Sequence, residues 1–256
     1  MESSMEDIPQ LDRRQFMSLA GATLVGTAMA AVPANAAAKS SLAIDHVSLG
    51  VRDLFEGSAR LNRETGITGI EGSWFPEGGM ANRYFRTGNN TYIEVEAIID
   101  PFAAETMITA RHLVERLRGG DCFLGWVARV NTREELDEIA ARLKSKVVDA
   151  PLGLGADGSA KPNYVRTPEA FTTWTKGLPN FMYWDGRPKP VVPGPTKPSG
   201  IAWLEIGGTQ AAMRDWIGPG IENLPLKFNG KAPGVHAVGV ESDRGIIEIR
   251  RRPLPL

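Results

Sequence analysis

The fold is decided in the stretch Ile44–Leu54, which reads IDHVSLGVRDL. In an extended strand successive side chains point to opposite faces, so Val47 and Leu49 share one face while His46 and Ser48 share the other. The apolar face is typical of a strand that packs on helices, and the polar face keeps an imidazole and a hydroxyl on the other side of the sheet. We therefore predict a strand over residues 42–51 that opens a small module.

Turn signals and apolar runs divide the residues that follow into one helix and three strands. The helix is predicted over Leu54–Glu64 and ends at Gly66, a residue type that commonly terminates helices. The strands are predicted around Gly69–Phe75, Ala81–Arg86 and Thr91–Ile98, and the turns between them are rich in glycine and asparagine. Residues 42–98 therefore have the predicted order β-α-β-β-β.

The same order of elements is predicted twice more along the chain. A helix at Glu105–Leu117 leads to a unit of about residues 121–186, and a connector with five prolines at Arg187–Ser199 leads to a third unit of about residues 200–250. The predicted elements of the second unit are a strand at Phe123–Val130, a helix at Thr132–Leu143, strands at Val147–Leu152, Phe171–Lys176 and Phe181–Trp184, and a loosely structured insertion at Gly153–Pro168. Those of the third are a strand at Ile201–Ile206, a helix at Thr209–Ile217, and strands near Leu226–Phe228, Val235–Val240 and Ile246–Arg250. Such repetition predicts an α+β fold of tandem βαβββ modules.

Residues 1–36 have the pattern of a twin-arginine signal peptide. Arg13 and Arg14 are followed by one free position, by Phe16 and by a large apolar residue, and the stretch Leu19–Val32 carries no charge. That stretch is too short and too weakly apolar for a stable membrane span. Small residues up to Ala36 suit cleavage after Ala36, so we predict recognition by the twin-arginine translocase and a periplasmic or secreted protein.

Composition gives no indication of a nucleic-acid partner or of a disulfide. The formal net charge of the chain is −1, and removal of the predicted signal peptide leaves basic and acidic residues almost balanced. Such a balance offers no electrostatic basis for binding nucleic acid. Cys122 is the only cysteine, so the chain forms no intramolecular disulfide, and its apolar neighbours predict a buried side chain.

Three segments carry a family resemblance. Ile44–Leu54 resembles the opening strand of vicinal-oxygen-chelate modules, whose hosts include glyoxalase I, extradiol dioxygenases and fosfomycin-resistance proteins. Gly79–Asn82 together with Thr91–Val95 resembles the more specific glyoxalase-like domain family. Across residues 42–250 the resemblance implies βαβββ modules whose curved mixed or antiparallel sheets surround a cavity. In metal-dependent members, His and Glu residues on the first and last strands of each module hold a divalent ion.

Strand alternation identifies the candidate site. Tyr92, Glu94 and Glu96 share a face of the fourth strand, and this face matches the polar face of the first strand that bears His46. His46 and Glu94 are suitable ligands for Zn²⁺, Mn²⁺ or Fe²⁺. Glu94 and Glu96 are the candidate catalytic residues, as a metal ligand or as a proton shuttle. The predicted pocket residues beside them are Ser48, Asn82 and Tyr92.

The ligand set is incomplete, which leaves two functions open. A catalytic ion usually has three protein ligands, and the second unit places Gly125 and Tyr183 where another His and Glu would stand. His236 and Glu248 could replace them only if a bulge changed the register of a hairpin in the third unit. The first function is a metal-assisted lyase, isomerase or ring-cleaving dioxygenase that acts on a small oxygenated molecule. The second is a metal-free protein that binds or sequesters such a molecule on the same fold.

Overall fold

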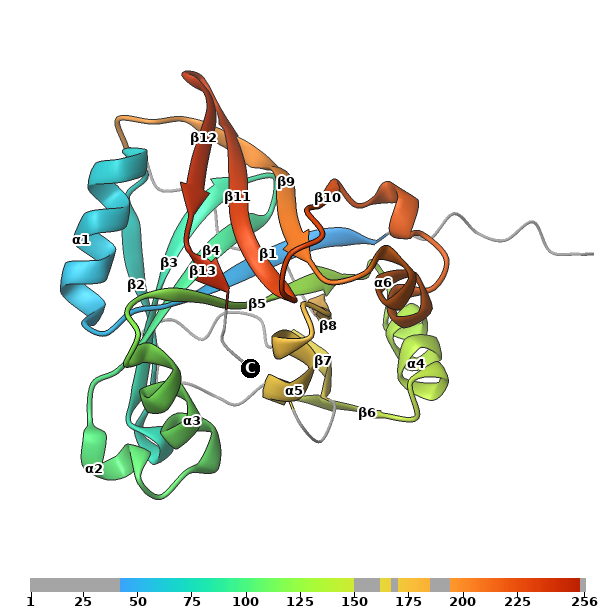
Figure 1. Cartoon of the computed structure of the whole chain (residues 1–256), viewed down its shortest axis with the longest axis horizontal. Helices are drawn as coiled ribbons and strands as arrows, with labels where there is room; N and C mark the ends of the chain where they lie inside the picture. Colours follow the sequence, from blue (N-terminus) through green and yellow to red (C-terminus); the bar gives the residue numbers. More distant parts are fainter. Residues whose placement is uncertain (1–41, 150–161, 167–169, 185–193, 254–256) are drawn as a thin grey trace, which may run out of the picture. The chain divides into compact units, whose positions relative to one another are not determined.

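The computed structural model describes residues 42–149, 162–166, 170–184 and 194–253 (Figure 1). The signal peptide predicted at residues 1–36 lies outside the described residues, as do most of the proline-rich connector and most of the predicted insertion. Among the residues that the structure describes, no helix is long and apolar enough to cross a membrane.

The first module has the predicted order of elements. These are β1 (Ala43–Gly50), α1 (Leu54–Thr65), β2 (Gly69–Phe75), β3 (Met80–Gly88) and β4 (Thr91–Ile98), with one 3₁₀ turn (Pro76–Gly78) before β3. The carboxylate of Asp53 accepts a hydrogen bond from the backbone N–H of Glu56 and caps the start of α1. Gly66 ends the helix with a φ of 68°, a left-handed conformation that favours glycine.

The second module contains one helix more than predicted. Its elements are β5 (Cys122–Arg129), α4 (Arg133–Arg142), β6 (Lys146–Asp149), β7 (Pro162–Arg166), α5 (Ala170–Thr175) and β8 (Asn180–Trp184). The strand predicted at Phe171–Lys176 is wrong, because its residues form α5. Threonine and aromatic residues favour strands, but here Trp174 packs over Gly125 and tertiary contact overrides propensity. The predicted insertion also contains β7, which is hydrogen-bonded to a strand on each side.

Two short helices replace the single helix predicted between the first two modules. These are α2 (Pro101–Ala104) and α3 (Ile108–Leu117). Asp100 accepts hydrogen bonds from the backbone N–H groups of Phe102 and Ala103 and so starts a helix earlier than the sequence pattern indicated.

The third unit repeats the order of elements but not the pairing of strands. It contains β9 (Pro198–Gly207), α6 (Gln210–Ile217), a 3₁₀ turn (Ile221–Asn223), β10 (Leu226–Phe228), β11 (Gly234–Ser242), β12 (Gly245–Arg250) and the short β13 (Arg252–Pro253). In the first two modules the strands lie in the orders β1-β4-β3-β2 and β5-β8-β7-β6, whereas the third has the order β10-β9-β11-β12. The third unit is therefore not a third copy of the module.

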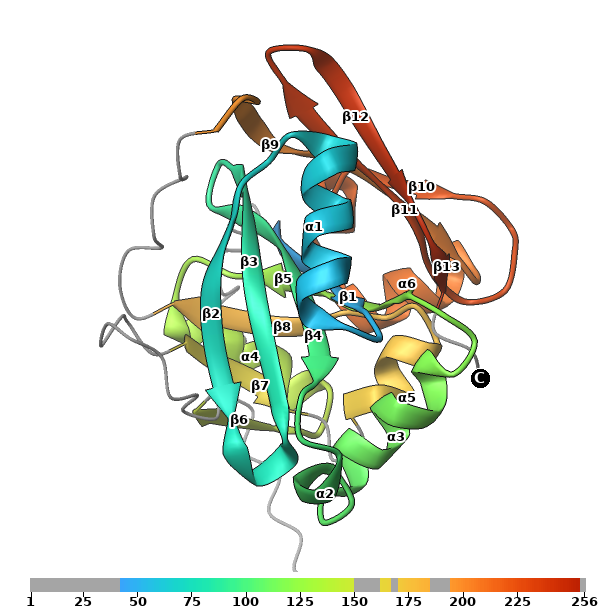
Figure 2. The same ribbon diagram turned by 90° about the vertical axis from the view of Figure 1, so that its left-hand side faces the viewer.

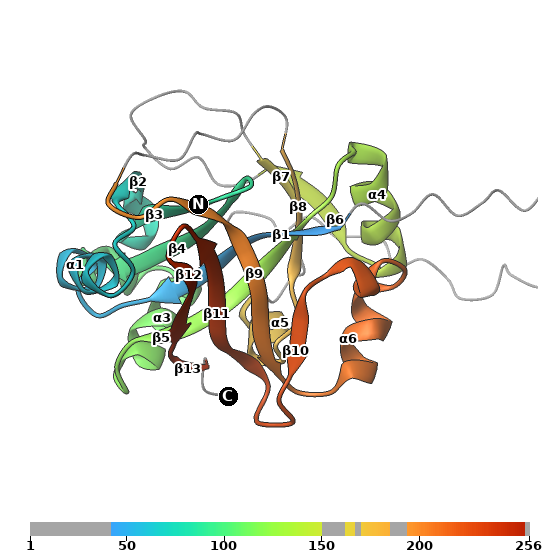
Figure 3. The ribbon, with the colours of Figure 1, turned by 90° about the horizontal axis from the view of Figure 1, so that it is seen from above.

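Antiparallel pairing of β1 with β5 joins the first two modules into one nine-stranded sheet, which also includes β13. The apolar residues of β1 and β4 face the four-stranded sheet and α1, and Figure 2 shows α1 lying along the strands of the first module. Figure 3 shows α4 beside α6, where Arg142 donates hydrogen bonds to the carbonyl oxygens of Asp215, Trp216 and Ile217. The main core therefore covers one face of the large sheet.

The opposite face of the large sheet carries polar side chains and a smaller apolar cluster. Leu113, Leu117, Cys122 and Leu124 form that cluster beside the β1 terminus at Gly50. Cys122 is buried, as predicted from its apolar neighbours.

Candidate functional site

Nine residues on three neighbouring strands form the polar face. Strand register places them in three rows across β1, β4 and β3, which are His46–Tyr92–Arg86, Ser48–Glu94–Tyr84 and Gly50–Glu96–Asn82. Five of the polar members are buried, namely His46, Ser48, Asn82, Arg86 and Tyr92, whereas Tyr84, Glu94 and Glu96 keep some exposure. Solvent therefore reaches this face at Tyr84, Glu94 and Glu96.

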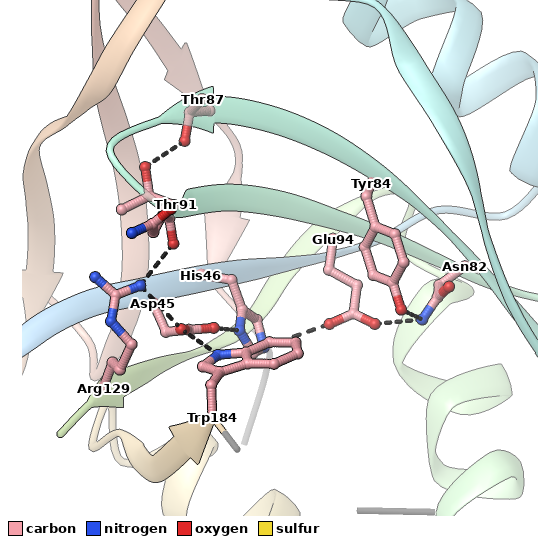
Figure 4. Close-up of polar contacts among 10 residues, drawn as sticks. Asp45, His46, Asn82, Tyr84, Thr87, Thr91, Glu94, Arg129 and Trp184 are labelled. Atoms are coloured by element: carbon pink, nitrogen blue, oxygen red, sulfur yellow. Dashed lines mark hydrogen bonds and ion pairs between the residues drawn. The ribbon is translucent and has the colours of Figure 1, made fainter. Parts of the chain in front are cut away.

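His46 and Glu94 meet at the centre of this face, as strand alternation predicted. The distance between His46 Nε2 and Glu94 Oε2 is 3.3 Å (Figure 4). The other carboxylate oxygen of Glu94 accepts a hydrogen bond from Nδ2 of Asn82. Oδ1 of Asn82 accepts from the backbone N–H of Ser73 at 2.6 Å, which fixes the amide so that its nitrogen faces Glu94. Asn82 therefore orients the carboxylate that contacts the imidazole.

Asp45 belongs to the site, although strict alternation placed it on the other face. An extra residue in β1 shifts its register with β5 between Ile44 and His46. Such a bulge re-aims a side chain, and here Asp45 Oδ1 lies 2.7 Å from Nδ1 of His46. Bulges cannot be read from an alternating pattern, so sequence reasoning missed this residue.

Asp45 is itself held by two donors that the sequence did not single out. Its Oδ2 accepts a hydrogen bond from Nε1 of Trp184 at 2.8 Å and lies 3.3 Å from Nη1 of Arg129. Arg129 also donates to the carbonyl oxygen of Asn90 at 2.7 Å. Asp45 is fully buried, and these contacts supply the charge and the hydrogen bonds that a buried carboxylate needs.

Aromatic contacts link the row that contains His46. The imidazole stacks on the ring of Tyr92 with centroids 4.6 Å apart and an interplanar angle of 18°. The guanidinium carbon of Arg86 lies 4.8 Å from the centroid of Tyr92 and 5.2 Å from that of Tyr84. Tyr92 is thus stacked between a cation and the imidazole.

Burial changes the protonation of the acidic groups on this face. It raises the pKa of Glu94, and the opposing effects of His46 and the Asn82 hydrogen bond only partly offset it. Burial, followed by the charge of Glu94, raises the pKa of Glu96 to about 8. The hydroxyl of Ser48 lowers the pKa of Glu96, although Ser48 Oγ has no partner at full hydrogen-bonding geometry. At neutral pH Glu96 therefore carries a proton.

The two tyrosines remain neutral. Burial and then the charge of Glu94 raise the pKa of Tyr84 to about 12. The pKa of Tyr92 is raised well above its ordinary value, by burial first and by the charge of Asp45 second. Both phenols therefore keep their protons over the physiological pH range.

The described residues bring together two metal-ligating groups rather than three. His46 and Glu94 are adjacent, but no cluster of three His, Cys, Asp or Glu side chains suited to a metal occurs in the described part of the chain. A Cβ atom at Gly125 would lie 2.1 Å from Cγ of Trp174, so the indole fills the space into which a histidine there would project. Tyr183 packs against the main core instead. Within the described residues, the donor set does not fit a catalytic metal centre.

The alternative pair in the third unit does not form. The hairpin of β11 and β12 pairs Gly239 with Glu248 and Ala237 with Arg250. Nε2 of His236 lies 2.8 Å from the carbonyl oxygen of Ala232, and Glu248 instead contacts Arg250. His236 and Glu248 are therefore ordinary structural and surface residues.

A cavity of about 190 Å³ lies away from this face. Its lining includes Leu42, Asn89, Ile201 and Arg129. Arg129 is the residue that links this cavity to Asp45, and His46 and Glu94 are not among the lining residues. The polar face is where the acid–base groups gather, so we place the candidate site there.

Comparison with known proteins agrees with this architecture. Residues 44–217 match the family described as the glyoxalase-like domain. A hypothetical protein from Staphylococcus aureus is similar in structure, with a TM-score of 0.50 and 14% identity over 82% of this chain and 85% of that chain. Methylmalonyl-CoA epimerase from Mycobacterium tuberculosis has a TM-score of 0.41 and 16% identity over 60% of this chain and 93% of its own. The first of these two likenesses shows the fold alone. The curated proteins include no significant match.

Proposed function

Because the chain belongs to the glyoxalase-like domain family, we propose that it is a lyase or isomerase that moves a proton on a small oxygenated molecule. The observation that carries this proposal is the contact of His46 with two carboxylates, a hydrogen bond between Nδ1 and Asp45 and a 3.3 Å contact between Nε2 and Glu94, on a largely buried face. An imidazole and a carboxylate in contact are the commonest groups for general acid–base catalysis.

Asp45 sets the direction of proton transfer. Asp45 contacts Nδ1 of His46, so Nε2 is the nitrogen that faces Glu94 and would exchange a proton with it. Burial raises the pKa of Glu94, which makes its carboxylate a stronger base than an exposed glutamate. The pair can take a proton from a carbon acid and return it to another position. Asp45 does not reach the substrate side of the imidazole and acts as a positioning residue.

Glu96 supplies a second function on the same face. A carboxylic acid that keeps its proton at neutral pH can donate a hydrogen bond to an oxygen that gains negative charge. Removal of a proton beside a carbonyl group produces such an oxygen. We therefore propose that Glu94 and His46 transfer the proton and that Glu96 is the acid that stabilises the negatively charged oxygen.

A metal-free binding function uses the same face without turnover. The incomplete donor set supports this second candidate against a metal-assisted enzyme, because the described residues provide two ligands where a catalytic ion usually has three. For the same reason we assign no step to a divalent ion. Metal analysis of protein purified without chelators tests this choice, and a stoichiometric Zn, Mn or Fe ion that is lost in His46→Ala would overturn it.

Proton exchange in D₂O tests the proposed reaction. Nuclear magnetic resonance would follow deuterium uptake at the C–H groups of two small carbonyl compounds, the anionic pyruvate and the neutral dihydroxyacetone. We expect His46→Gln and Glu94→Gln each to slow exchange by about 10²- to 10⁴-fold, the usual contribution of a general acid or base. His236→Gln is the matched control, because that histidine lies outside the site.

Two outcomes would count against the enzyme. Exchange at the unaltered rate in His46→Gln contradicts the proposed pair. Binding of either compound without exchange in the native protein supports the metal-free binding function instead.

We also propose that the protein is exported by the twin-arginine pathway to the periplasm or beyond. The arginine pair, the uncharged stretch and the small residues before Ala37 support this location.

A further inference from the structure

Arg86 is a buried cation that forms no ion pair with any acidic residue of the described chain. Only 5% of its surface is exposed, and neither Nε nor Nη1 has a hydrogen-bond partner. Other arginines of the described chain do pair with carboxylates, as Arg129 does with Asp45 and Arg250 with Glu205. Arg86 instead lies against the ring faces of Tyr84 and Tyr92.

Such an arrangement is costly for the protein alone. A guanidinium removed from water loses its hydration, and buried charges are normally paired or hydrogen-bonded. The faces of the tyrosine rings attract the cation. They do not act as hydrogen-bond acceptors for its N–H groups, which point outward in the plane of the guanidinium. An oxyanion would satisfy both the charge and the donors, because guanidinium geometry matches carboxylate and phosphate.

The position of Arg86 connects it to the proposed proton-transfer pair. Arg86, Tyr92 and His46 form one row across three strands, so the guanidinium and the imidazole lie on the two sides of the same tyrosine. Glu94 follows Tyr92 by two residues on the middle strand. Neighbouring strands lie about 4.8 Å apart, so a molecule of a few carbon atoms spans the distance from Arg86 to Glu94.

We propose that Arg86 binds the carboxylate or phosphate group of the substrate, which makes the substrate a small oxyacid. This inference rests on the proposed function, because it places the reacting carbon over His46 and Glu94. The bound anion holds the molecule at one end, while its carbonyl oxygen lies toward Glu96.

Calorimetric titration of the full-length protein tests the proposal. Three probes are compared, namely pyruvate as a carboxylate, inorganic phosphate, and pyruvamide as a neutral analogue of pyruvate. We expect native protein to bind one or both anions and to bind pyruvamide weakly. Arg86→Met should weaken anion binding by about 10- to 100-fold, the value of a charge-assisted hydrogen bond, and should leave pyruvamide binding unchanged. The anion that binds more tightly shows whether the site prefers a carboxylate or a phosphate.

Arg83→Met is the matched control. Arg83 lies on the same strand but alternates to the other face, and its Nε likewise has no hydrogen-bond partner. We expect this variant to bind the anions as native protein does. Thermal unfolding adds an independent measurement, because Arg86→Met removes an unpaired buried charge and should unfold at the native temperature or above it.

The outcomes separate this inference from the proposed reaction. Equal binding of pyruvate and pyruvamide by native protein, unchanged anion binding in Arg86→Met, or a large fall in its unfolding temperature would each show that Arg86 is structural. If only the inference is correct, His46→Gln binds pyruvate normally while native protein exchanges no proton. If only the proposed reaction is correct, Arg86→Met keeps native exchange with both pyruvate and dihydroxyacetone.

Discussion

Asp45, His46 and Glu94 each depend on a neighbour for the state in which they act. Asp45 is held in the interior by contacts with Arg129 and Trp184, and it in turn orients His46. Glu94 is oriented by Asn82, whose amide is fixed by the backbone of β2. Gly72 permits this last contact, since a Cβ there would lie 1.9 Å from Oδ1 of Asn82. At the scale of residues, the site is a connected polar network, and the protonated Glu96 lies at its edge.

Glu96 should make folding stability fall as pH rises. Its pKa is about 8 in the folded protein against an ordinary value of 4.5, so between these values the folded chain holds a proton that the unfolded chain has lost. The free energy of unfolding then decreases by at most about 1.4 kcal/mol per pH unit. The free energy of unfolding, measured with urea from pH 5 to 8, should decrease less steeply in Glu96→Gln than in native protein, because glutamine is neutral at every pH.

The exposed Glu241 provides the control for this experiment. Glu241→Gln should follow the native pH dependence. If Glu96→Gln also follows it, Glu96 is ionised in the folded protein and cannot be the stabilising acid.

At the scale of elements, the two modules of the large sheet have diverged at equivalent positions. The bulge in β1 turns Asp45 toward His46. At the position that His46 occupies in β1, the strand β5 has Gly125. Trp174 of α5 occupies the space above Gly125. One module therefore supplies the acid–base groups, and the other supplies an aromatic cover.

Gly125→Ala tests that cover. The added Cβ would lie 2.1 Å from the indole of Trp174, so the helix α5 must shift. We expect the free energy of unfolding to fall by about 1–3 kcal/mol, as in other overpacked interiors, with a change in tryptophan fluorescence. Gly119→Ala is the control, because the nearest atom to its Cβ, Nη2 of Arg252, would lie 3.1 Å away. Equal stability of the two variants would show that Trp174 is not packed as described.

At the scale of the whole molecule, the large sheet separates stability from chemistry. One face packs in the main core against the four-stranded sheet, α1, α4 and α6, and the other face holds the polar rows. Buried polar groups are tolerated there because the apolar core on the opposite face supplies stability. Substitutions on the polar face should therefore alter function with smaller effects on folding than substitutions in the main core.

Export is the remaining prediction for the whole chain. Replacement of Arg13 and Arg14 by lysine should retain the precursor in the cytoplasm, because the translocase receptor reads the arginine pair rather than its charge. Cell fractionation followed by immunodetection measures the location. Arg52→Lys is the control, and it should leave export unchanged. Periplasmic delivery of the double-lysine variant at the native level would contradict twin-arginine export.

Local patterns in the sequence determined the order of elements in the first module and the shared face of His46 and Glu94. These features depend on a period of two residues in strands, on turn-forming residues and on the stop at Gly66, all of which act over a few positions. The sequence also identified the lone buried Cys122 and the lack of ligands at Gly125 and Tyr183.

Only the tertiary structure decided how those elements combine. Pairing of β1 with β4 brings Nε2 and Oε2 to 3.3 Å, and pairing of β1 with β5 creates the bulge that recruits Asp45. The helix α5 and the different strand order of the third unit likewise depend on partners distant in the chain. The burial of Arg86 also depends on segments that are distant in the chain. Strand pairing, bulges and burial arise from contacts between segments far apart in the sequence, and no local period encodes them.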